Sequence, residues 1–498
     1  MGWPLHMREV AVFDANAVAL GIEVSDLMAA AGRALAERAW ALAAGGHVLI
    51  MCGPGNNGGD GYAAALALEN ILEDAVAAHP EGSRRGVPKI DVRVLASHKR
   101  QKGEVALSFR ERCSDVEVWT KDTKWKRPKL VVDCLLGAGA GGKPRGKIGG
   151  MVKWARKHNP KQVLACDIPT GLGSELCLPA DETVTFHSLK QGMDDPAVGE
   201  VTVAPLPWPS ETIDCGPGDI LRFPPFDDEA HKGERGRVLV IGGGPYHGAP
   251  LLAGTAAARS GCDLVHVAMP RDALERAEWP SHLIPERLPD DERLAERSPE
   301  FISELLESRR VDAVVIGPGL GRHVETDESV KEILDILVEA DIPTVIDADA
   351  LYSLPAGAWP ADLRGVATPH KQELTIWMWK ETPQSVLMAA EAGFEDPESC
   401  VIIRTGAVDQ LHGFEGRRCD CRGGHPRMAT GGTGDLLAGI IAGLLAQGMS
   451  PWPAARLGCH ILRRAGAAAA EEHGPGMLAS DVPVHISKQL MLLLNEIG

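Results

Sequence analysis

The chain has few aromatic residues, no long apolar run and no excess of positive charge. Only 4% of its 498 residues are Phe, Trp or Tyr, and abundant alanine and glycine favour close packing of helices against sheets. No apolar run approaches the roughly 18 residues of a membrane span, and no signal-peptide pattern opens the chain. We therefore expect no membrane segment and a cytoplasmic location. The net charge of −17 argues against a nucleic-acid partner, because phosphate backbones are bound by basic faces.

Paired cysteine spacings are also missing. The eleven cysteines are scattered, which is typical of reduced, buried thiols. Cys419 and Cys421, with His412 and His425 nearby, form the one cluster of possible ligands. A metal site there is the minor alternative to buried thiols.

The length of the chain predicts more than one domain. Hydrophobic residues make up 44% and charged residues 24%, as in soluble globular proteins, and 498 residues exceed one ordinary core. Prolines crowd between Ala204 and Asp228, where the regular patterns fade, which indicates a boundary. We assign residues 1–213 and 214–498 to two domains.

The first half shows strands followed by polar, glycine-rich loops. Apolar strands are expected at residues 47–52, 130–136 and 162–166, and the first runs into a glycine-rich turn before an alanine-rich helix from Tyr62. Polar residues at strand ends indicate a parallel α/β sheet with a ligand site at that edge. Asn57, Asp133 and Thr170 would then converge, and their oxygens suit a hard cation. Stabilisation of tight turns is the alternative role for each of them.

These motifs resemble the NAD(P)H-hydrate epimerase family across nearly the whole first half. The similarity lies in the run from Gly55 to Gly61 (GNNGGDG), in Val132-Asp133 with its glycine-rich loop, in Asp167-Ile168-Pro169-Thr170-Gly171, and in residues 183–186 with Lys190 and Gly192. The resemblance implies a Rossmann-like three-layer domain that interconverts the R and S forms of hydrated NADH and NADPH. It also implies K⁺ held by Asn57, Asp133 and Thr170, although the family more often has serine at the last position.

The resemblance further implies the residues that line the epimerase substrate site. These are Asn56, Asn57, Gly58, Gly59, Asp60, Gly137, Ala138, Gly139, Ala140, Gly141, Gly142, Lys143 and Asp167. Which of Asp60 and Asp167 moves protons is left open by the sequence.

The second half repeats the strand–loop–helix alternation and contains a second glycine-rich element. Residues 429–434 (ATGGTG) precede Asp435 and an apolar run that ends before Gly448, which predicts a loop feeding a buried helix. The N-terminus of such a helix suits an oxyanion or a phosphate. Asp435 is either a helix N-cap or a base beside an alcohol.

This second set of motifs resembles the ADP-dependent NAD(P)H-hydrate dehydratase family of the ribokinase-like superfamily, from about Lys232 to the end of the chain. The overall prediction is therefore an α/β protein with two three-layer αβα domains, an epimerase domain followed by a ribokinase-like domain. By family mapping, the hydrated nicotinamide nucleotide would face Ala249, Gly319, Gly321, His370 and Asp435. The AMP portion would contact Thr405, Gly406, Ala407, Val408, Asp409 and Gly434.

Thr405 departs from the family pattern, which usually has lysine there. A threonine hydroxyl offsets less phosphate charge than an ammonium group, so the preference for ADP over ATP stays open.

The resulting hypothesis is a bifunctional repair enzyme whose partners are hydrated NADH or NADPH and ADP, with Mg²⁺ accompanying ADP and Asp435 as the base. A plain small-molecule kinase is one alternative, and a non-catalytic interaction module in the first half is another. Exposed sheet edges favour a homo-oligomer.

Overall fold

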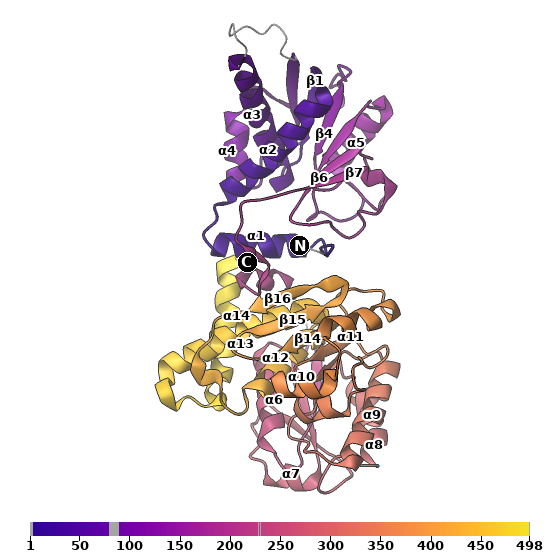
Figure 1. Ribbon diagram of the computed structural model, residues 1–498, viewed down its shortest axis with the longest axis vertical. Coiled ribbons are helices and arrows are strands. Elements are labelled where there is room, and N and C mark those ends of the chain that lie inside the picture. Colours follow the sequence, from indigo (N-terminus) through magenta and orange to yellow (C-terminus); the bar gives the residue numbers. More distant parts are fainter. Residues whose placement is uncertain (1–2, 79–88, 228, 230, 498) are drawn as a thin grey trace. The chain divides into compact units, whose positions relative to one another are not determined.

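The computed structural model describes residues 3–78, 89–227, 229 and 231–497. It divides into two compact units, Met1–Thr212 and Ile213–Gly498. Each unit has its own sheet between helices, so the expected α/β class is confirmed (Figure 1). No helix in the described part of the chain is long and apolar enough to cross a membrane.

The first unit is built on a seven-stranded sheet of order β3-β2-β1-β4-β5-β6-β7, with every neighbouring pair parallel. Its strands are β1 (Gly46–Cys52), β2 (Ile90–Ala96), β3 (Val116–Val118), β4 (Leu130–Cys134), β5 (Val163–Cys166), β6 (Glu182–Phe186) and β7 (Glu200–Ala204). Its helices are α1 (Glu9–Ala19), α2 (Val24–Ala43), α3 (Asn56–Ala77), α4 (Glu104–Arg112) and α5 (Gly146–His158).

Alternation of side chains along the buried strands divides the first core into two layers. In β1, Val48, Ile50 and Cys52 pack with α2, α3 and α4, whereas Leu49 and Met51 pack with α5 (Figure 1). Successive residues of a strand point to opposite faces. A continuous apolar strand therefore implies helices on both faces of the sheet.

The second unit has a nine-stranded sheet of order β10-β9-β8-β11-β12-β13-β14-β15-β16. Its strands are β8 (Arg237–Ile241), β9 (Leu264–Met269), β10 (Ile284–Arg287), β11 (Ala313–Ile316), β12 (Thr344–Ile346), β13 (Gly365–Ala367), β14 (Cys400–Arg404), β15 (Asp409–Gly413) and β16 (Arg418–Cys421). The last two pairings are antiparallel. The strand–helix alternation in the sequence did not indicate these antiparallel pairings of β14, β15 and β16.

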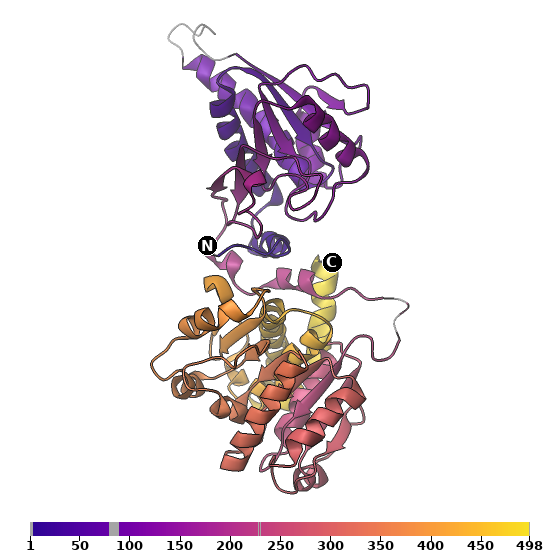
Figure 2. The same ribbon diagram turned by 90° about the vertical axis from the view of Figure 1, so that its right-hand side faces the viewer.

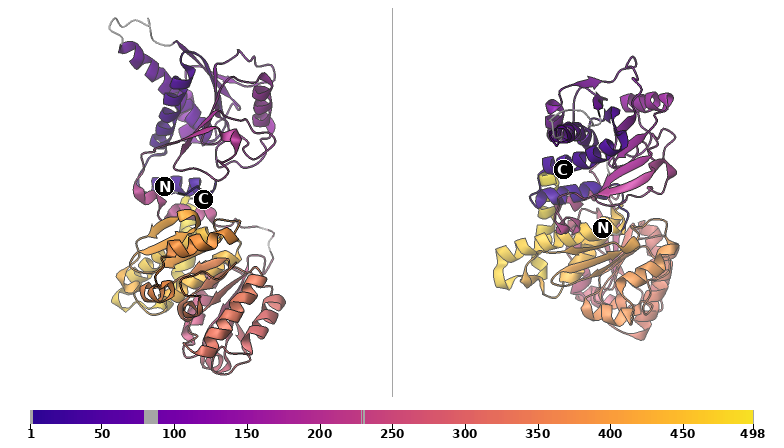
Figure 3. Two further views of the ribbon diagram at one scale, coloured as in Figure 1. Left: turned by 45° about the vertical axis from the view of Figure 1, so that its right-hand side comes forward. Right: turned by 45° about the horizontal axis from the view of Figure 1, so that its top comes forward.

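Helices cover both faces of the second sheet. They are α6 (Gly248–Arg259), α7 (Arg271–Arg276), α8 (Ser298–Arg309), α9 (Val324–Glu339), α10 (Lys371–Met378), α11 (Pro383–Ala390), α12 (Thr433–Ala446), α13 (Pro451–His473) and α14 (Pro483–Ile497). Val238 and Val240 of β8 join the core beside α6, α12 and α13, whereas Leu239 and Ile241 join the core beside α8 and α9. Figures 2 and 3 show α8 and α9, in salmon, against the second sheet.

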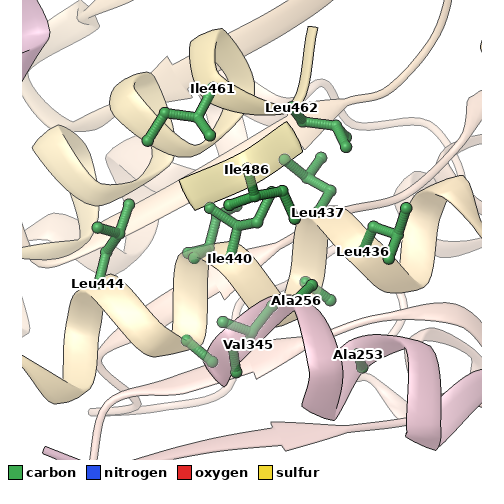
Figure 4. Close-up of a cluster of buried hydrophobic side chains, with 14 of the residues drawn as sticks. Ala253, Ala256, Val345, Leu436, Leu437, Ile440, Leu444, Ile461, Leu462 and Ile486 are labelled. Atoms are coloured by element: carbon green, nitrogen blue, oxygen red, sulfur yellow. The ribbon is translucent and has the colours of Figure 1, made fainter. Parts of the chain in front are cut away.

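Helix α12 is the centre of the second core. Every residue from Leu436 to Ala446 is buried, between α6, α13, α14 and the sheet (Figure 4). A helix that is apolar all round is stable only in such an enclosed position. This packing fixes the N-terminus of α12 at the sheet edge.

The proline-rich segment between the sheets contains little regular structure. Its described residues form two 3₁₀ helices, Ser210–Ile213 and Pro217–Arg222. The second is anchored to α13 by a buried ion pair, with Arg456 Nε 2.6 Å from Asp219 Oδ1. The core of the second unit therefore includes residues that precede its first strand.

Candidate active sites at the two sheet edges

The asparagine–glycine run of the first unit is the first part of α3. The helix begins at Asn56, so the prediction of a turn that gives way to a helix at Tyr62 was wrong. Close packing explains the glycines. A Cβ on Gly58 would lie 1.9 Å from the carbonyl oxygen of Gly53, and one on Gly61 would lie 2.8 Å from Cys52 Sγ.

Asp133 and Thr170 meet at the carboxyl end of β4. Both are fully buried; Thr170 Oγ1 donates to Asp133 Oδ1 at 2.8 Å, and the Thr170 amide donates to Oδ2 at 2.9 Å. Burial raises the pKa of Asp133 to about 6, against these hydrogen bonds, which lower it. Among the described residues, no lysine, arginine or histidine forms an ion pair with this carboxylate. A buried carboxylate without a cationic side chain fits a metal cation.

Asn57 approaches the same edge from α3. A Cβ on Gly137 would lie 2.9 Å from Asn57 Oδ1 and 3.0 Å from Asp167 Oδ2. The side-chain nitrogen Nδ2 of Asn57 is buried and has no hydrogen-bond partner among the described residues. The Asn57 and Asp167 side chains therefore flank Gly137 at the start of the loop of residues 137–143.

Asp167 forms a buried ion pair with Lys190. Lys190 Nζ lies 2.7 Å from Asp167 Oδ1, and the amide of Ala138 donates to Oδ2 at 2.8 Å. Burial alone would raise the pKa of Asp167, but Lys190 and the Ala138 amide hold it below its usual value.

Asp60 has the opposite electrostatic environment. Burial, followed by the negative charges of Asp167 and Asp14, raises its pKa well above the usual value. Two carboxyl groups at one sheet edge are thus driven toward different protonation states. This separation is typical of acid–base pairs.

The outer part of the loop of residues 137–143 projects away from the core. A Cβ added at Gly139, Gly141 or Gly142 would meet no atom within 4 Å. Lys143 is exposed and pairs with Glu175 at 2.8 Å. Gly137 and Ala138 therefore lie beside Asp167, whereas Gly139, Gly141 and Gly142 border open space.

The second unit also gathers its loops at the carboxyl ends of its strands. Glycines with positive φ turn the chain after β8 and β11, at Gly243, Gly317, Gly319 and Gly321. A Cβ on Gly317 would lie 1.8 Å from the carbonyl oxygen of Asp347. The amide of Gly321 donates to Asp349 Oδ2 at 2.8 Å, which joins the loop after β11 to the loop after β12.

Asp435 occupies the first turn of α12. Gly432, with φ of 97°, is the N-cap, and no side chain caps this helix. The N-cap interpretation of Asp435 was therefore wrong. Burial, then Asp347 and Asp349, raise the pKa of Asp435 to about 8. Gly434, which precedes it, is exposed, and Ala249 lies in the first turn of α6, which packs against α12.

Four carboxylates surround this second site. Burial raises the pKa of Asp347 and of Glu373, and His370 partly opposes both shifts. Among the described residues, the ion pairs of Asp347, Asp349, Glu373 and Asp435 include no lysine or arginine. The site thus carries negative charge that an arriving cation would offset.

His370 joins the site while also capping a helix. Its Nδ1 accepts hydrogen bonds from the amides of Gln372 and Glu373 at 3.1 Å, and its Nε2 lies 3.4 Å from Glu373 Oε1. Thr405 pairs with this segment, since its amide donates to the Pro369 carbonyl at 3.0 Å. The Thr405 hydroxyl donates to the same carbonyl at 3.4 Å.

The loop of residues 405–408 is shaped by Asp409 and Arg463. Asp409 accepts a hydrogen bond from the Gly406 amide at 3.0 Å and binds Arg463 at 2.8 Å. Arg463 also donates to the carbonyls of Gly406 and Ala407. Both oxygens of Asp409 are therefore engaged within the protein, which holds the 405–408 loop in place.

The cysteine cluster does not form a metal site among the described residues. Cys215 Sγ lies 3.8 Å from Cys419 Sγ, and burial raises the pKa of both thiols well above the usual value. No group of three or more His, Cys, Asp or Glu residues in the described ranges could hold a metal ion. The interpretation as buried thiols holds.

Sequence reasoning missed four residues that support the second site. Asp347, Asp349, Glu373 and Arg463 were not among the predicted site residues. Asp347 and Asp349 do follow an apolar strand directly, which is the signal that could have identified them. Arg463 lies on a helix far along the chain, and its bonds to the 405–408 loop carry no local sequence signal.

Comparisons with known proteins match both halves in order. The model of the NAD(P)H-hydrate dehydratase family matches residues 238–488, and that of the YjeF-related protein N-terminus matches residues 24–192. The bifunctional NAD(P)H-hydrate repair enzyme of Methanothermobacter thermautotrophicus is 34% identical over 95% of this chain and 93% of its own. That of Hyperthermus butylicus is 34% identical over 98% of this chain and 93% of its own.

One solved structure that the chain resembles is the ADP/ATP-dependent NAD(P)H-hydrate dehydratase of Bacillus subtilis, co-crystallised with ATP and Mg²⁺. It is 22% identical, the match covers 56% of this chain and 96% of the other, and the TM-score is 0.46. The family is shown by the near full-length relatives. The chain belongs to the bifunctional NAD(P)H-hydrate repair enzymes.

Proposed function

We propose that this chain repairs hydrated nicotinamide cofactors with two separate active sites. The first unit interconverts the R and S forms of hydrated NADH and NADPH. The second unit dehydrates the S form while ADP is converted to AMP and phosphate. The observation that supports this proposal most strongly is that both motif sets lie at the carboxyl edges of two separate sheets.

For the second unit, the chemistry follows from the substrate. The hydrated ring carries a hydroxyl on C6, and hydroxide is a poor leaving group. Asp435 accepts the hydroxyl proton while the oxygen attacks the β-phosphorus of ADP, and AMP leaves. The lone pair of the ring nitrogen then expels phosphate from C6, and loss of a proton from C5 restores the dihydropyridine.

The loops of the second unit are suited to hold the phosphates. The amides of residues 431–434 lie at the N-terminus of α12, where backbone N–H groups and the helix dipole favour anions. The 405–408 loop, held by Arg463, would receive the AMP portion. His370 and Ala249 would face the nicotinamide nucleotide with Gly319 and Gly321.

For the first unit, we propose that Asp60 and Asp167 form the acid–base pair. C6 carries both the hydroxyl and the ring nitrogen, so breaking either bond makes this carbon planar and allows attack from the other face. Asp60, with a raised pKa, is suited to donate a proton, and Asp167, with a lowered pKa, is suited to accept one.

Two cations fit the residues present. K⁺ would be held by Asn57, Asp133 and Thr170 beside the first site. Mg²⁺ would arrive with ADP at the carboxylates of the second unit, because it is commonly bound by one or two carboxylates and by phosphates. When bound, Mg²⁺ neutralises phosphate charge during transfer.

Near-ultraviolet absorbance of NADH tests this proposal. Purified protein is given a mixed R and S preparation of hydrated NADH, with or without ADP and Mg²⁺. Complete recovery of NADH absorbance that requires ADP supports both activities. Recovery that stops when the S form is exhausted would contradict the epimerase, and a stable phosphorylated product would favour a plain kinase.

A further inference from the structure

Lys190, the lysine beside Asp167 in the first unit, is buried and has all its hydrogen-bonding capacity used inside the protein. Lys190 is 1% exposed. Its Nζ donates to Asp167 Oδ1, to the hydroxyl of Thr185 and to the carbonyl oxygen of Phe186. The three hydrogens of the ammonium group therefore have three acceptors.

This arrangement fixes the direction of the Asp167 carboxylate. Its Oδ1 receives Lys190 and, at 3.3 Å, the hydroxyl of Thr185. Its Oδ2 is turned the other way, to the Ala138 amide and the space beside Gly137. The backbone of Asp167 has φ of 67°, a conformation that non-glycine residues adopt at a cost and that often marks a functional position.

The backbone around Lys190 is held by the N-terminal segment. The amide of Leu5 donates to the Leu189 carbonyl at 2.7 Å, and the Gln191 amide donates to the Leu5 carbonyl at 3.0 Å. The Ser188 hydroxyl donates to the Trp3 carbonyl at 2.7 Å. The lysine is thus anchored from its backbone as well as from its ammonium group.

Stability alone is a weak reason for such a pair. Burying two charges costs desolvation, and an apolar pair of similar volume is often as stable. A carboxylate held in one orientation at a site is instead useful for a reaction that depends on geometry.

We infer that Lys190 is a positioning residue of epimerisation, which holds the Asp167 carboxylate with Oδ2 directed at the ring that binds beside Gly137. The inference rests on the proposal that Asp167 faces the hydrated nicotinamide. Thr185 completes the support by bonding both partners.

The test follows the conversion of the R form to the S form by chromatography in the full-length chain without ADP. In Lys190→Met, kcat falls about 100-fold, as expected when a reacting group is misplaced by about 1 Å, while KM changes less than about threefold. Dehydration of the S form by the same preparation is unchanged and reports on the second unit.

A matched pair of threonine variants separates positioning from packing. Thr183 and Thr185 are both fully buried on β6, but the Thr183 hydroxyl donates to the Val198 carbonyl at 2.7 Å, away from Asp167. Thr185→Val lowers kcat about tenfold through the lost hydrogen bonds to charged groups, whereas Thr183→Val leaves kcat within about twofold. Thermal unfolding of both variants shows whether their stability losses are similar.

Equal kcat losses in the two threonine variants, in proportion to lost stability, would overturn the inference. Unchanged kcat in folded Lys190→Met would overturn it too. Asp167→Asn separates this inference from the proposed function. If Asp167→Asn abolishes epimerisation but Lys190→Met does not, only the positioning role fails; if Asp167→Asn is fully active, the assigned site itself fails.

Discussion

The two sites of this chain handle negative charge in opposite ways. In the first unit, Asp167 is neutralised by a buried lysine 2.7 Å away, and Asp60 has a raised pKa. In the second unit, burial, then Asp347 and Asp349, raise the pKa of Asp435, and burial with Asp349 raises the pKa of Asp347. Asp167 of the first site is thus paired with a lysine, whereas the carboxylates of the second site have no lysine or arginine in their ion pairs among the described residues.

The surroundings of the first site extend this contrast. Lys99, Arg100 and Lys102 are exposed in the loop between β2 and α4. Gln101 in that loop donates to the carbonyls of Gly53 and Gly55, next to α3. Burial, then Lys147 and Lys102, lower the pKa of His98. A protein of net charge −17 thus has a basic surface near the start of α3, formed by Lys99, Arg100, Lys102 and Lys147 and called here the basic rim.

Replacement of Asp435, the proposed base, should produce the largest difference between the activities of the two sites. In Asp435→Asn we expect dehydration of the S form to fall by about 10²- to 10⁴-fold, the usual contribution of a general base. Epimerisation, measured chromatographically, stays within about twofold. Equal loss of both activities would contradict the separation of the two sites.

The same variant has an expected effect on stability. Burial and two neighbouring aspartates raise the pKa of Asp435 from 3.8 to about 8 in the folded protein. The ionised carboxylate is thus disfavoured in the folded state, so Asp435 lowers the free energy of unfolding increasingly as pH rises from about 4 to about 8. Asp435→Asn should therefore unfold at a higher temperature than the parent at pH 9 and at a similar temperature at pH 4. A lower unfolding temperature at pH 9 would contradict the raised pKa.

Removal of K⁺ should affect the first site alone. Replacing KCl by choline chloride at constant ionic strength lowers epimerisation and the unfolding temperature of the first unit. A ligand at 100 times its Kd stabilises by about 2.7 kcal/mol. Asp133→Asn should abolish this K⁺ response. Asp181→Asn is the matched control, because Asp181 accepts a hydrogen bond from the Val163 amide at the start of β5, on the opposite edge of the sheet from Asp133. If this variant loses the response as well, the cation binds elsewhere.

The sequence predicted what depends on local pattern. The strands expected at residues 47–52 and 162–166 correspond within one residue to β1 and β5, because a buried strand of a parallel sheet reads as a continuous apolar segment. The placement of Asp435 in the first turn of α12 followed from the glycines before it and the apolar run after it.

What the sequence did not predict depends on contacts between distant segments. The glycines from Gly58 to Gly61 looked like a turn because their close neighbours, such as Gly53 and Cys134, are identified only by tertiary packing. Lys190 was part of the family motif, but its pairing with Asp167 depends on how the loop after β6 is held by Leu5.

The pH dependence of dehydration tests whether a bound cation changes the protonation of Asp435. At limiting Mg²⁺ we expect the rate to rise with pH up to about 8, because burial and two neighbouring aspartates keep Asp435 protonated below that pH. Saturating Mg²⁺ should move the rise to lower pH, since a bound cation favours the carboxylate. A profile that is independent of Mg²⁺ would contradict the electrostatic account of this site.

A substitution at Thr405 should have a smaller effect and should improve the binding of ADP rather than weaken the activity. Thr405→Lys adds a positive charge beside the proposed nucleotide loop and should lower KM for ADP by up to about tenfold, equivalent to about 1.4 kcal/mol. Thr405→Ser, which keeps the hydroxyl that bonds the Pro369 carbonyl, serves as the control and should differ little from the parent. Initial rates at varied ADP measure both, and an unchanged KM in Thr405→Lys would place the phosphates elsewhere.

The smallest expected effect concerns the basic rim. Lys102→Gln and Lys147→Gln should each raise KM for hydrated NADPH in epimerisation by about two- to threefold at low salt, and the difference should shrink at high salt because exposed charges are screened. KM for dehydration serves as the internal control. Equal changes at both sites would show that the rim acts on the whole molecule.

Complementation between two inactive chains tests the division into two sites most directly. Asp167→Asn and Asp435→Asn are each given pure R-form hydrated NADH with ADP and Mg²⁺, alone and mixed, and NADH absorbance is followed against an enzyme-free control. Neither variant alone should regenerate NADH beyond the control rate, and the mixture should regenerate it fully. A mixture that stays inactive, or NADH formation by Asp435→Asn alone, would contradict two independent sites with these residues at their centres.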